Sequence, residues 1–396
     1  MVNAKRQKIA NVSKTLVFVY LVLFPFGQLL RFDTSFSGVH LTIHPIDIVV
    51  GLSIPFYVLG FIRVPSVYKQ FLGFMSVATF SLVISLSAFD LLEVFVGSFY
   101  LIRLFAYSTF FLMVWNLVKK DLSYKRTLFY SLILVCVCCA IFGWIQYFWI
   151  PDLRFLTELH WDDHLNRLAG TFLDPSFTSL ILVFGFLMSL SVYLRKQRKV
   201  LLTTMVFLIV TIAFTYTRAS FLALVAGICM FLYWQKKRVV VFSIIVVFAM
   251  LVIFLPRPAG EGVRLERSRS IVAKLENYRQ TLRIVKLNPL FGVGFNNMCP
   301  ARLQLYSGSA RSHACSGTDS SILFVLATTG VVGSVVFFNF AKEALGKVGK
   351  GVYGKALLAC IMALLVHSLF VNSMFYPWII GWMAVLFGIS MKSAKE

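Results

Sequence analysis

The fold is decided by a polar stretch, residues 256–319, whose central part reads IVAKLENYRQTLRIVKLNPLFGVGF (271–295). This polar stretch carries ten lysine and arginine residues and only four acidic residues. On either side of it the chain consists of long apolar runs separated by short polar connections. The sequence therefore predicts three parts, which are residues 1–255, the polar stretch and residues 320–396.

The composition indicates a membrane protein. Hydrophobic residues make up 59% of the 396 residues and charged residues make up 14%, whereas soluble domains are about one-quarter charged. In a membrane protein the positions of lysine and arginine report how the chain is oriented, so the net charge of +22 is read segment by segment. We therefore expect membrane lipids, and no nucleic acid, as partners.

Twelve apolar runs approach the length of about 20 residues that a membrane-spanning helix needs. They lie near residues 15–32, 43–62, 70–89, 94–117, 127–150, 170–193, 200–216, 218–234, 239–255, 320–340, 355–373 and 375–391. The sequence thus predicts an all-α, polytopic transmembrane helical bundle of about 12 spans. Spans 1–9 fall within residues 1–255, and spans 10–12 fall within residues 320–396.

Lysine and arginine gather in every second connection between these runs. The opposite connections before residue 256 hold only Arg31, Arg154, Arg167 and Arg218. Because cytoplasmic loops carry the excess of basic residues, this pattern places both termini in the cytoplasm and the polar stretch outside. Long loops cross the membrane largely regardless of their charge, so the basic polar stretch is compatible with an extracytoplasmic loop.

The polar stretch has helical apolar spacing over residues 271–286. One face would carry Ile271, Leu275, Tyr278, Leu282 and Val285. Lys274 and Arg279 border this face, and Arg283 follows one turn after Arg279. Such a helix would lie on the membrane surface; alternatively, its charges form an ordinary solvated basic surface.

Two of the seven cysteines, Cys299 and Cys315, lie in the polar stretch. They could form a disulfide if this loop faces an oxidising compartment, and they would otherwise stay free thiols. The other five lie inside apolar runs, where a free thiol behaves as a small apolar side chain.

Three local strings occur in a fixed order. They are RLAGTFLDPSFTSLIL (167–182), FTYTRASFLALVAG (214–227), and LNPLFGVGF (287–295) followed by TDSSILFVLATTGVVG (318–333). In this order, with a large outer loop after the second string, they resemble the bacterial O-antigen ligase and Wzy-type polymerase superfamily of membrane glycosyltransferases. The resemblance covers roughly residues 165–340.

The resemblance implies an activity at the outer face of the bacterial cytoplasmic membrane. The donor would be a glycan on undecaprenyl diphosphate, and the acceptor would be a hydroxyl group on a glycan, a lipid or a protein. The reaction would invert the anomeric carbon and would need neither a metal nor another cofactor. The strings do not distinguish a polymerase from a ligase or a protein O-glycosyltransferase.

By the same resemblance, Arg218 and Arg167 would bind the diphosphate, because a guanidinium group forks onto phosphate oxygens and stays charged. Arg279, Arg283 and Lys274 of the loop helix would add cations.

The acceptor hydroxyl needs a general base, which would be His313 or Asp319. The chain departs from the family pattern here. Asp319 stands where many members have a His-Asn pair, and His313 lies six residues earlier. Lys274 and Tyr278 stand where members often have arginine and tryptophan.

Each of these residues also has a plainer interpretation. Arg218 could be a snorkelling arginine, Arg167 an interfacial anchor, His313 an incidental loop residue, and Asp319 the N-cap of a helix that starts at Ser320.

Other polar residues lie outside these strings. The string HWDDH (160–164) suggests a metal site only weakly, because a third ligand is not evident. Arg103 and Glu93 could pair within the membrane or line the core, and Arg103 has no assigned role.

Two other functions remain open at this point. Twelve spans with both termini inside also suit a transporter or flippase for an anionic or lipid-linked substrate. However, the two halves of the chain show no matching pair of Gly/Pro-broken spans. The protein could also be a structural partner in an envelope complex, with the polar stretch as its docking surface.

Overall fold

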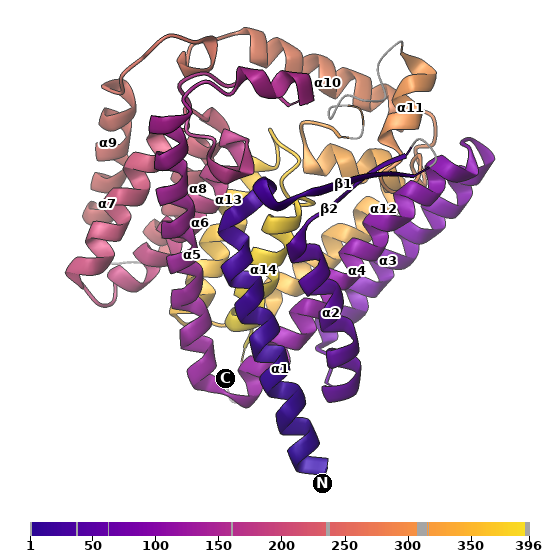
Figure 1. Cartoon of the computed structure of the whole chain (residues 1–396), viewed down its shortest axis with the longest axis horizontal. Coiled ribbons are helices and arrows are strands. Elements are labelled where there is room, and N and C mark those ends of the chain that lie inside the picture. Colours follow the sequence, from indigo (N-terminus) through magenta and orange to yellow (C-terminus); the bar gives the residue numbers. More distant parts are fainter. Residues whose placement is uncertain are drawn as a thin grey trace.

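The computed structural model describes residues 2–36, 39–61, 63–159, 161–234, 238–306, 315 and 317–392. Within these residues the chain forms fourteen α-helices and one two-stranded antiparallel hairpin (Figure 1). The helices are α1 (Val2–Leu23), α2 (Pro45–Gly60), α3 (Ser66–Ile84), α4 (Leu91–Lys120), α5 (Leu122–Trp149), α6 (Pro175–Tyr193), α7 (Lys199–Ala213), α8 (Arg218–Trp234), α9 (Arg238–Ile253), α10 (Arg269–Val285), α11 (Met298–Leu305), α12 (Ser321–Gly346), α13 (Val352–His367) and α14 (Pro377–Ser390). The hairpin pairs β1 (Phe32–Phe36) with β2 (Val39–Ile43).

Every predicted apolar run coincides with an apolar helix, so the all-α prediction is confirmed. Six helices are long and apolar enough to cross a membrane, namely α1 with the turn that follows it, α3, α4, α5, α6 and α12. The other six, α2, α7, α8, α9, α13 and α14, are apolar helices whose described parts are 10–17 residues long. The count of about 12 spans therefore stays a prediction.

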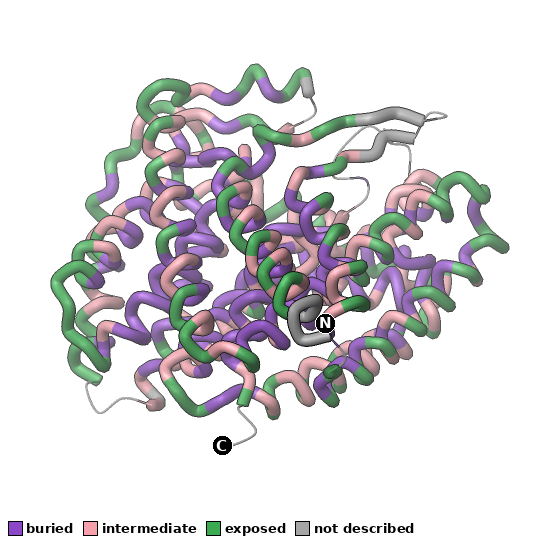
Figure 2. Tube along the Cα trace, turned by 60° about the horizontal axis from the view of Figure 1, so that its bottom comes forward, coloured by how far each residue is buried: buried purple, intermediate pink, exposed green. Residues whose placement is uncertain are grey.

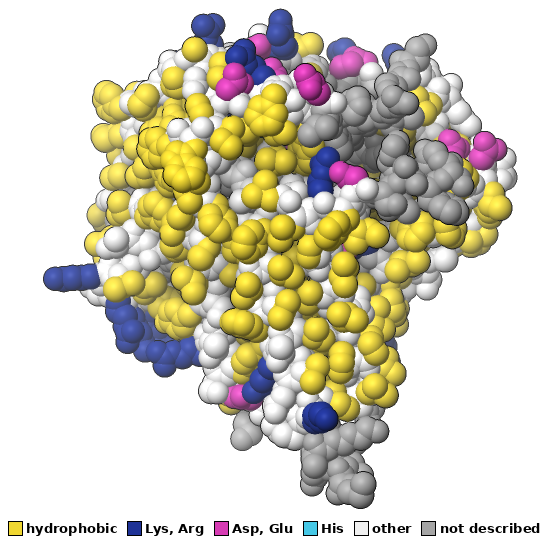
Figure 3. Space-filling view, in the orientation of Figure 1, with side chains coloured by type: hydrophobic (Ala, Val, Ile, Leu, Met, Phe, Trp, Pro, Cys, Tyr) yellow, Lys and Arg dark blue, Asp and Glu magenta, His cyan; other side chains and the backbone are white. Residues whose placement is uncertain are grey.

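Both chain ends lie at one end of the bundle, and the non-spanning elements lie at the other (Figure 1). We call the latter the loop end; it carries α10, α11, the β1–β2 hairpin and residues 151–174. Hydrophobic side chains cover the middle of the visible surface, and charged side chains gather near its two ends (Figure 3). An apolar belt of this extent would be anomalous on a soluble monomer, and it agrees with a membrane location.

The core lies where α6, α13 and α14 meet α4, α5 and α8. α6 is buried along almost its whole length, and Trp378 and Trp382 of α14 are fully buried. The outer helices keep exposed faces (Figure 2). Arg103 of α4 pairs with Asp47 of α2 at 3.0 Å. Of the two alternatives that the sequence left open for Arg103 and Glu93, pairing with each other is not observed.

α12 is broken at Gly330, which has a φ of 66° and a ψ of −167°. The loop after α10 runs through the break: Val331 N donates to Pro289 O at 2.9 Å, and Val293 N donates to Ala327 O at 2.9 Å. A Cβ on Gly330 would lie 2.2 Å from Leu290 O. The glycines of the third string thus allow two backbones to approach closely, and the freed backbone groups find partners within the protein.

α10 lies across the loop end (Figure 1), and it confirms the helix expected over residues 271–286. The predicted apolar face stays largely uncovered: Ile271, Leu275 and Leu282 are 47–51% exposed. The face that packs against the bundle instead carries Thr281 and Ile284, which are fully buried. The exposed apolar flank is available for the predicted contact with the membrane surface.

Candidate functional site

Arg218 is the first residue of α8 and reaches toward the start of α10. Its Nη1 donates to the carbonyl oxygens of Leu265 and Arg267, both at 3.0 Å, and its Nη2 donates to Ser270 Oγ at 2.7 Å. The turn before α8 places it there, since Tyr216 adopts a left-handed φ of 51°. Arg218 and α10 therefore belong to the same end of the bundle.

Two further arginines converge on the same turn. Arg167 is only 8% exposed; its Nε donates to Thr215 O at 3.1 Å and its Nη2 to Thr217 Oγ1 at 3.2 Å. The carbonyl oxygen of Tyr216 accepts from both Arg167 and Arg267, each at 3.5 Å. We call Arg167, Arg218 and Arg267 the arginine cluster.

The arginine cluster concentrates positive charge. None of its members forms an ion pair with a carboxylate of the described residues. Burial, with help from Arg267 and Arg218, lowers the pKa of Arg167 to about 10, although Asp174 and Asp162 act in the opposite direction. Burial and the charge of Arg218 also lower the pKa of Arg267. An anion bound among the three would relieve this repulsion.

The cluster has hydrogen bonds left for such an anion. A guanidinium group has five N–H donors. Each of the three arginines uses three of them on oxygen atoms of the protein. Each side chain therefore keeps two N–H groups without an acceptor among the described residues. The carbonyl contacts hold the guanidinium planes in place. Donors without such an acceptor are suited to phosphate oxygens.

A second polar group lies farther along α10. Lys274 Nζ lies 3.1 Å from Asp319 Oδ1 and donates to Phe370 O at 2.6 Å. Asn277 Oδ1 accepts from the backbone N of Asp319 at 2.9 Å, and the hydroxyl of Tyr278 donates to the Asp319 carbonyl at 3.4 Å. These contacts join α10, the start of α12 and the turn after α13.

One face of α10 connects the two groups. Ser270, which binds Arg218, is one turn before Lys274, and Asn277 follows after three more residues. Residues at this spacing lie on one side of a helix. The structure therefore brings Arg218, Lys274 and Asp319 to the inner side of α10, whereas Arg167 lies at the turn before α8.

Arg279 and Arg283 lie elsewhere. Arg279 is 74% exposed and approaches Glu276 only at 3.9 Å. Arg283 Nη1 lies 3.4 Å from the hydroxyl of Tyr306. Neither contact involves a residue of the arginine cluster, and the predicted part of these two arginines in diphosphate binding stays a prediction.

Of the two predicted general bases, His313 and Asp319, the structure describes only Asp319. His313 lies outside the described residues. Asp319 does not cap α12, because Ser320 is the N-cap and its Oγ accepts from Leu323 N at 3.4 Å. Asp319 is instead paired with Lys274, and its Oδ2 accepts no hydrogen bond from the described residues. Asp319 is thus a carboxylate whose Oδ1 binds Lys274 and whose Oδ2 has no donor among the described residues.

Residues 161–174 add buried polar groups beside Arg167. His164 is only 8% exposed; burial, with the charge of Arg167, lowers its pKa to about 4 against the influence of Asp162 and Asp163. Burial and the charge of Asp174 raise the pKa of Asp162. The metal interpretation also involved His160, which lies outside the described residues. Among those that are described, no group of three His, Cys, Asp or Glu residues could hold a metal ion.

His164 should make stability depend on pH. Between pH 6.5 and pH 4 the unfolded chain binds a proton at this residue that the folded chain does not, so stability falls as pH falls. At pH 5 the loss is about 2 kcal/mol. We expect His164→Asn to show a smaller drop in Tm between pH 7.5 and pH 5 than the unchanged protein. Equal drops in the two proteins would contradict this assignment.

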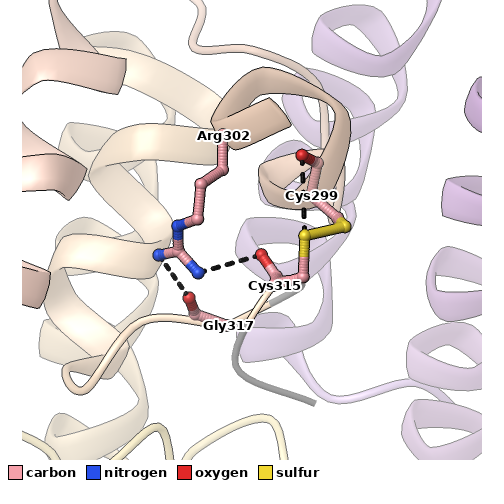
Figure 4. Close-up of a disulfide and its surroundings, with 4 residues drawn as sticks. All are labelled: Cys299, Arg302, Cys315 and Gly317. Atoms are coloured by element: carbon pink, nitrogen blue, oxygen red, sulfur yellow. Dashed lines mark hydrogen bonds between the residues drawn. A yellow bond between two sulfur atoms is a disulfide. The ribbon is translucent and has the colours of Figure 1, made fainter. Parts of the chain in front are cut away.

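A disulfide joins Cys299 of α11 to Cys315 (Figure 4), so the pairing that the sequence left open is confirmed. Arg302 reinforces it: Nη1 donates to Cys315 O at 3.1 Å and Nη2 to Gly317 O at 2.9 Å. These bonds attach α11 to the residues that lead directly into Asp319. A disulfide also favours an oxidising compartment for the loop end.

Reduction of this disulfide should destabilise the loop end. The bridge closes a loop with a sequence separation of 16, for which chain entropy gives about 3 kcal/mol. We expect Cys299→Ser/Cys315→Ser to lower Tm and to make the loop more sensitive to protease. Cys229→Ser, which removes an exposed free thiol, is the control. Equal Tm values in both variants would show that the bridge does not stabilise the protein.

Arg267 was not selected from sequence. It lies between Arg264 and Arg269 in one short string. Nothing in the string indicates which of the three arginines is part of the site. Its position follows from contacts with Gly262 O at 2.7 Å and with the turn before α8. Such contacts depend on the fold and leave no periodic signal.

Part of the chain that contains the candidate site matches a known protein family. Residues 203–338 match the model of a family described as O-antigen ligase. This range includes Arg218, Arg267, Lys274 and Asp319, and it ends before α13. Arg167 and the first of the three strings precede it. No curated protein matches the chain. This match over residues 203–338 confirms the resemblance to the O-antigen ligase family that the sequence strings predicted.

Proposed function

We propose that the protein transfers a glycan from an undecaprenyl-diphosphate-linked donor to an acceptor hydroxyl at the loop end. The family match supports a membrane glycosyltransferase of the ligase or polymerase type in general. The arginine cluster is the observation that carries the more specific proposal. The guanidinium groups of Arg167 and Arg267 share the carbonyl oxygen of Tyr216, and that of Arg218 binds the carbonyl oxygen of Arg267. None of the three has a carboxylate ion pair among the described residues.

The arginine cluster would act on the leaving group. In the transfer, the acceptor oxygen forms a bond with the anomeric carbon while the bond from that carbon to the diphosphate oxygen breaks. The diphosphate departs with the bonding electron pair, so its negative charge grows. Preorganised donors aimed at growing charge are worth several kcal/mol in a partly dehydrated site. Attack opposite to the leaving group inverts the anomeric carbon.

The acceptor hydroxyl also loses a proton. Asp319 is the described candidate for the base, because its Oδ2 is open and its Oδ1 is held by Lys274. The proton of the hydroxyl would pass to this oxygen, which keeps the reaction balanced in charge and atoms. His313 remains the second candidate. In this scheme the arginine side chains stabilise the leaving group, and no metal takes part.

A reaction in detergent tests the proposal. The purified full chain is mixed with undecaprenyl-diphosphate-linked glycan and EDTA. The offered acceptors are a second copy of the donor, a lipid-linked glycan, or a hydroxyl-bearing protein. We expect a larger glycan or a glycosylated acceptor, together with free undecaprenyl diphosphate. A requirement for sealed vesicles would favour a transporter or flippase, and loss of activity with EDTA would contradict the metal-free scheme.

Localisation follows the same reasoning. An undecaprenyl-diphosphate donor and an arginine cluster at the loop end fit a multi-pass protein of the bacterial cytoplasmic membrane. The loop end then faces outward, and both termini lie in the cytoplasm. Reaction of single-cysteine variants at the loop end with a membrane-impermeant maleimide in whole cells would test this orientation.

A further inference from the structure

The last residue of α13, His367, is a fully buried histidine that the proposed reaction scheme does not use. Its Nδ1 lies 2.6 Å from Ser373 Oγ. We propose that His367 is a positioning residue. Its bond to Ser373 fixes the turn after α13 (residues 368–376), and this turn holds Lys274 and, through it, Asp319. The role of Asp319 as the base rests on the proposed function, whereas the contacts that hold the turn do not.

The presence of a histidine at this position is explained by its bond to Ser373. The other buried residues of α13 are glycine, alanine, leucine and cysteine. An imidazole among them loses its hydrogen bonds to water, and this loss must be compensated within the protein. The bond to Ser373 Oγ compensates it for Nδ1. An apolar residue would pack at the end of the helix without such a partner, so the histidine stabilises the turn rather than the helix.

The bond between His367 and Ser373 closes a short segment of the chain. The carbonyl oxygen of His367 accepts from the backbone N of Phe370 and of Val371, both at 3.0 Å. Ser373 N donates to Val371 O at 2.8 Å. The side-chain bond joins the two ends of this hydrogen-bonded segment. The peptide groups between the two ends are therefore held in one arrangement.

Two carbonyl oxygens within this segment hold α10. Phe370 O accepts from Lys274 Nζ at 2.6 Å, and Leu369 O accepts from the hydroxyl of Tyr278. Lys274 and Tyr278 are one turn apart on α10, so they lie on one side of it. The turn after α13 thus fixes the position of this side of α10.

The same turn also holds the start of α12. Ser321 N donates to Ser368 O at 2.9 Å, and Met374 N donates to Ser321 Oγ at 3.1 Å. Ser321 follows Asp319 by two residues. Asp319 and its partner Lys274 are thus attached to one turn. A shift of this turn would change the 3.1 Å contact between Lys274 Nζ and Asp319 Oδ1.

Loss of the bond between His367 and Ser373 should therefore slow the transfer without removing a group that touches the substrates. A misplacement of ~1 Å far from the reacting atoms can cost about 100-fold in rate. Binding of the donor should change less. The arginine cluster makes its hydrogen bonds with residues 215–217 and 262–270. Because none of these belongs to the turn after α13, KM for the donor should change less than about threefold.

Two substitutions remove the bond from opposite sides. His367→Leu replaces the imidazole by an apolar side chain of similar volume, and Ser373→Ala removes the hydroxyl. We expect each to lower kcat at least ~10-fold, measured with the full chain in detergent and an undecaprenyl-diphosphate-linked glycan as donor. The double variant should lose no more than the more affected single variant, because both substitutions remove one bond. Additive losses, or full activity of both single variants, would overturn the proposal.

Matched controls separate the bond from the packing. Ser368→Ala makes the same change at a fully buried serine of the same turn, whose Oγ has no partner among the described residues. Its kcat should stay within about twofold of the unchanged protein. His367→Asn leaves a cavity but keeps a donor and an acceptor, so it should retain more activity than His367→Leu. The opposite order would show that the histidine acts through packing alone, and it too would contradict the proposal.

Hydrogen exchange tests the positioning without any activity. In Ser373→Ala the peptide that covers residues 317–323 should exchange faster than in Ser368→Ala. Equal exchange in the two variants would overturn the proposal, and this comparison decides the question if His367→Leu fails to fold.

The outcomes also separate the two proposals. Faster exchange in Ser373→Ala, together with an unchanged protein that transfers no glycan, would sink the proposed function and leave the support of Asp319 by the turn standing. Glycan transfer that is lost in Arg218→Ala but retained in full by His367→Leu and Ser373→Ala would do the reverse.

Discussion

Arg218→Ala is expected to lower the rate of glycan transfer at least ~100-fold, which is typical for removing one preorganised donor from growing charge. The substitution removes a fixed cation whose remaining N–H groups would bind the proposed diphosphate. Arg218→Lys should recover only a small part, because an ammonium is a point charge and cannot reproduce the contacts of Nη1 and Nη2. Initial rates of product formation at saturating donor give the measurement.

Two control variants isolate this effect. Ser270→Ala removes the hydroxyl that holds Arg218 Nη2 but keeps the charge, so we expect a loss below ~10-fold. Arg269→Ala removes an arginine whose side chain is 85% exposed, and its rate should stay within about twofold. Thermal unfolding confirms that each variant is folded. An Arg218→Ala protein with normal Tm and full activity would exclude the proposed role.

Gly330→Ala is expected to destabilise the protein by on the order of 3 kcal/mol, the upper part of the range for a residue forced into a glycine-only backbone region. Gly330 has a φ of 66° and a ψ of −167°. A Cβ there would lie 2.2 Å from Leu290 O, which is a backbone atom and cannot rotate away. Tm measured by circular dichroism in detergent should therefore fall sharply.

The same helix offers the matched control for this substitution. A Cβ on Gly346 would have no neighbour within 4 Å, so Gly346→Ala should change stability by less than about 1 kcal/mol. If Gly330→Ala and Gly346→Ala unfold at the same temperature, the break in α12 is not a required feature of the fold.

The helices of the bundle could be predicted from sequence because a long apolar run in a membrane must satisfy its backbone hydrogen bonds internally, as a helix does. All the predicted runs became helices, and α10 appeared where its 3.6-residue period predicted it. The break at Gly330 could not be predicted in the same way. Hydropathy is continuous across it, and only the insertion of residues 289–293 produces it.

The candidate site could be predicted in part. Arg218, Lys274 and Asp319 lie along the inner side of α10, and Arg167 lies at the turn before α8. Their predicted roles as diphosphate ligands and base stay predictions. The apolar residues of α10 predicted a face on the membrane surface, and they gave no prediction of the side that packs against the bundle. Ser270, Asn277 and Thr281 pack inward because Arg218, Asp319 and Thr318 satisfy their polar atoms. A periodicity argument counts such residues as solvent-facing, since it cannot see their partners.

The connection between α10 and α12 is short, so movement of one helix affects the other. Val285 ends α10, and seven residues later Gly292 is locked against the backbone of Thr328. A connection this short has little slack, so a tilt of α10 is transmitted to the segment of α12 on both sides of Gly330. Movement of α10 at the membrane surface is then coupled to movement of α12 within the bundle.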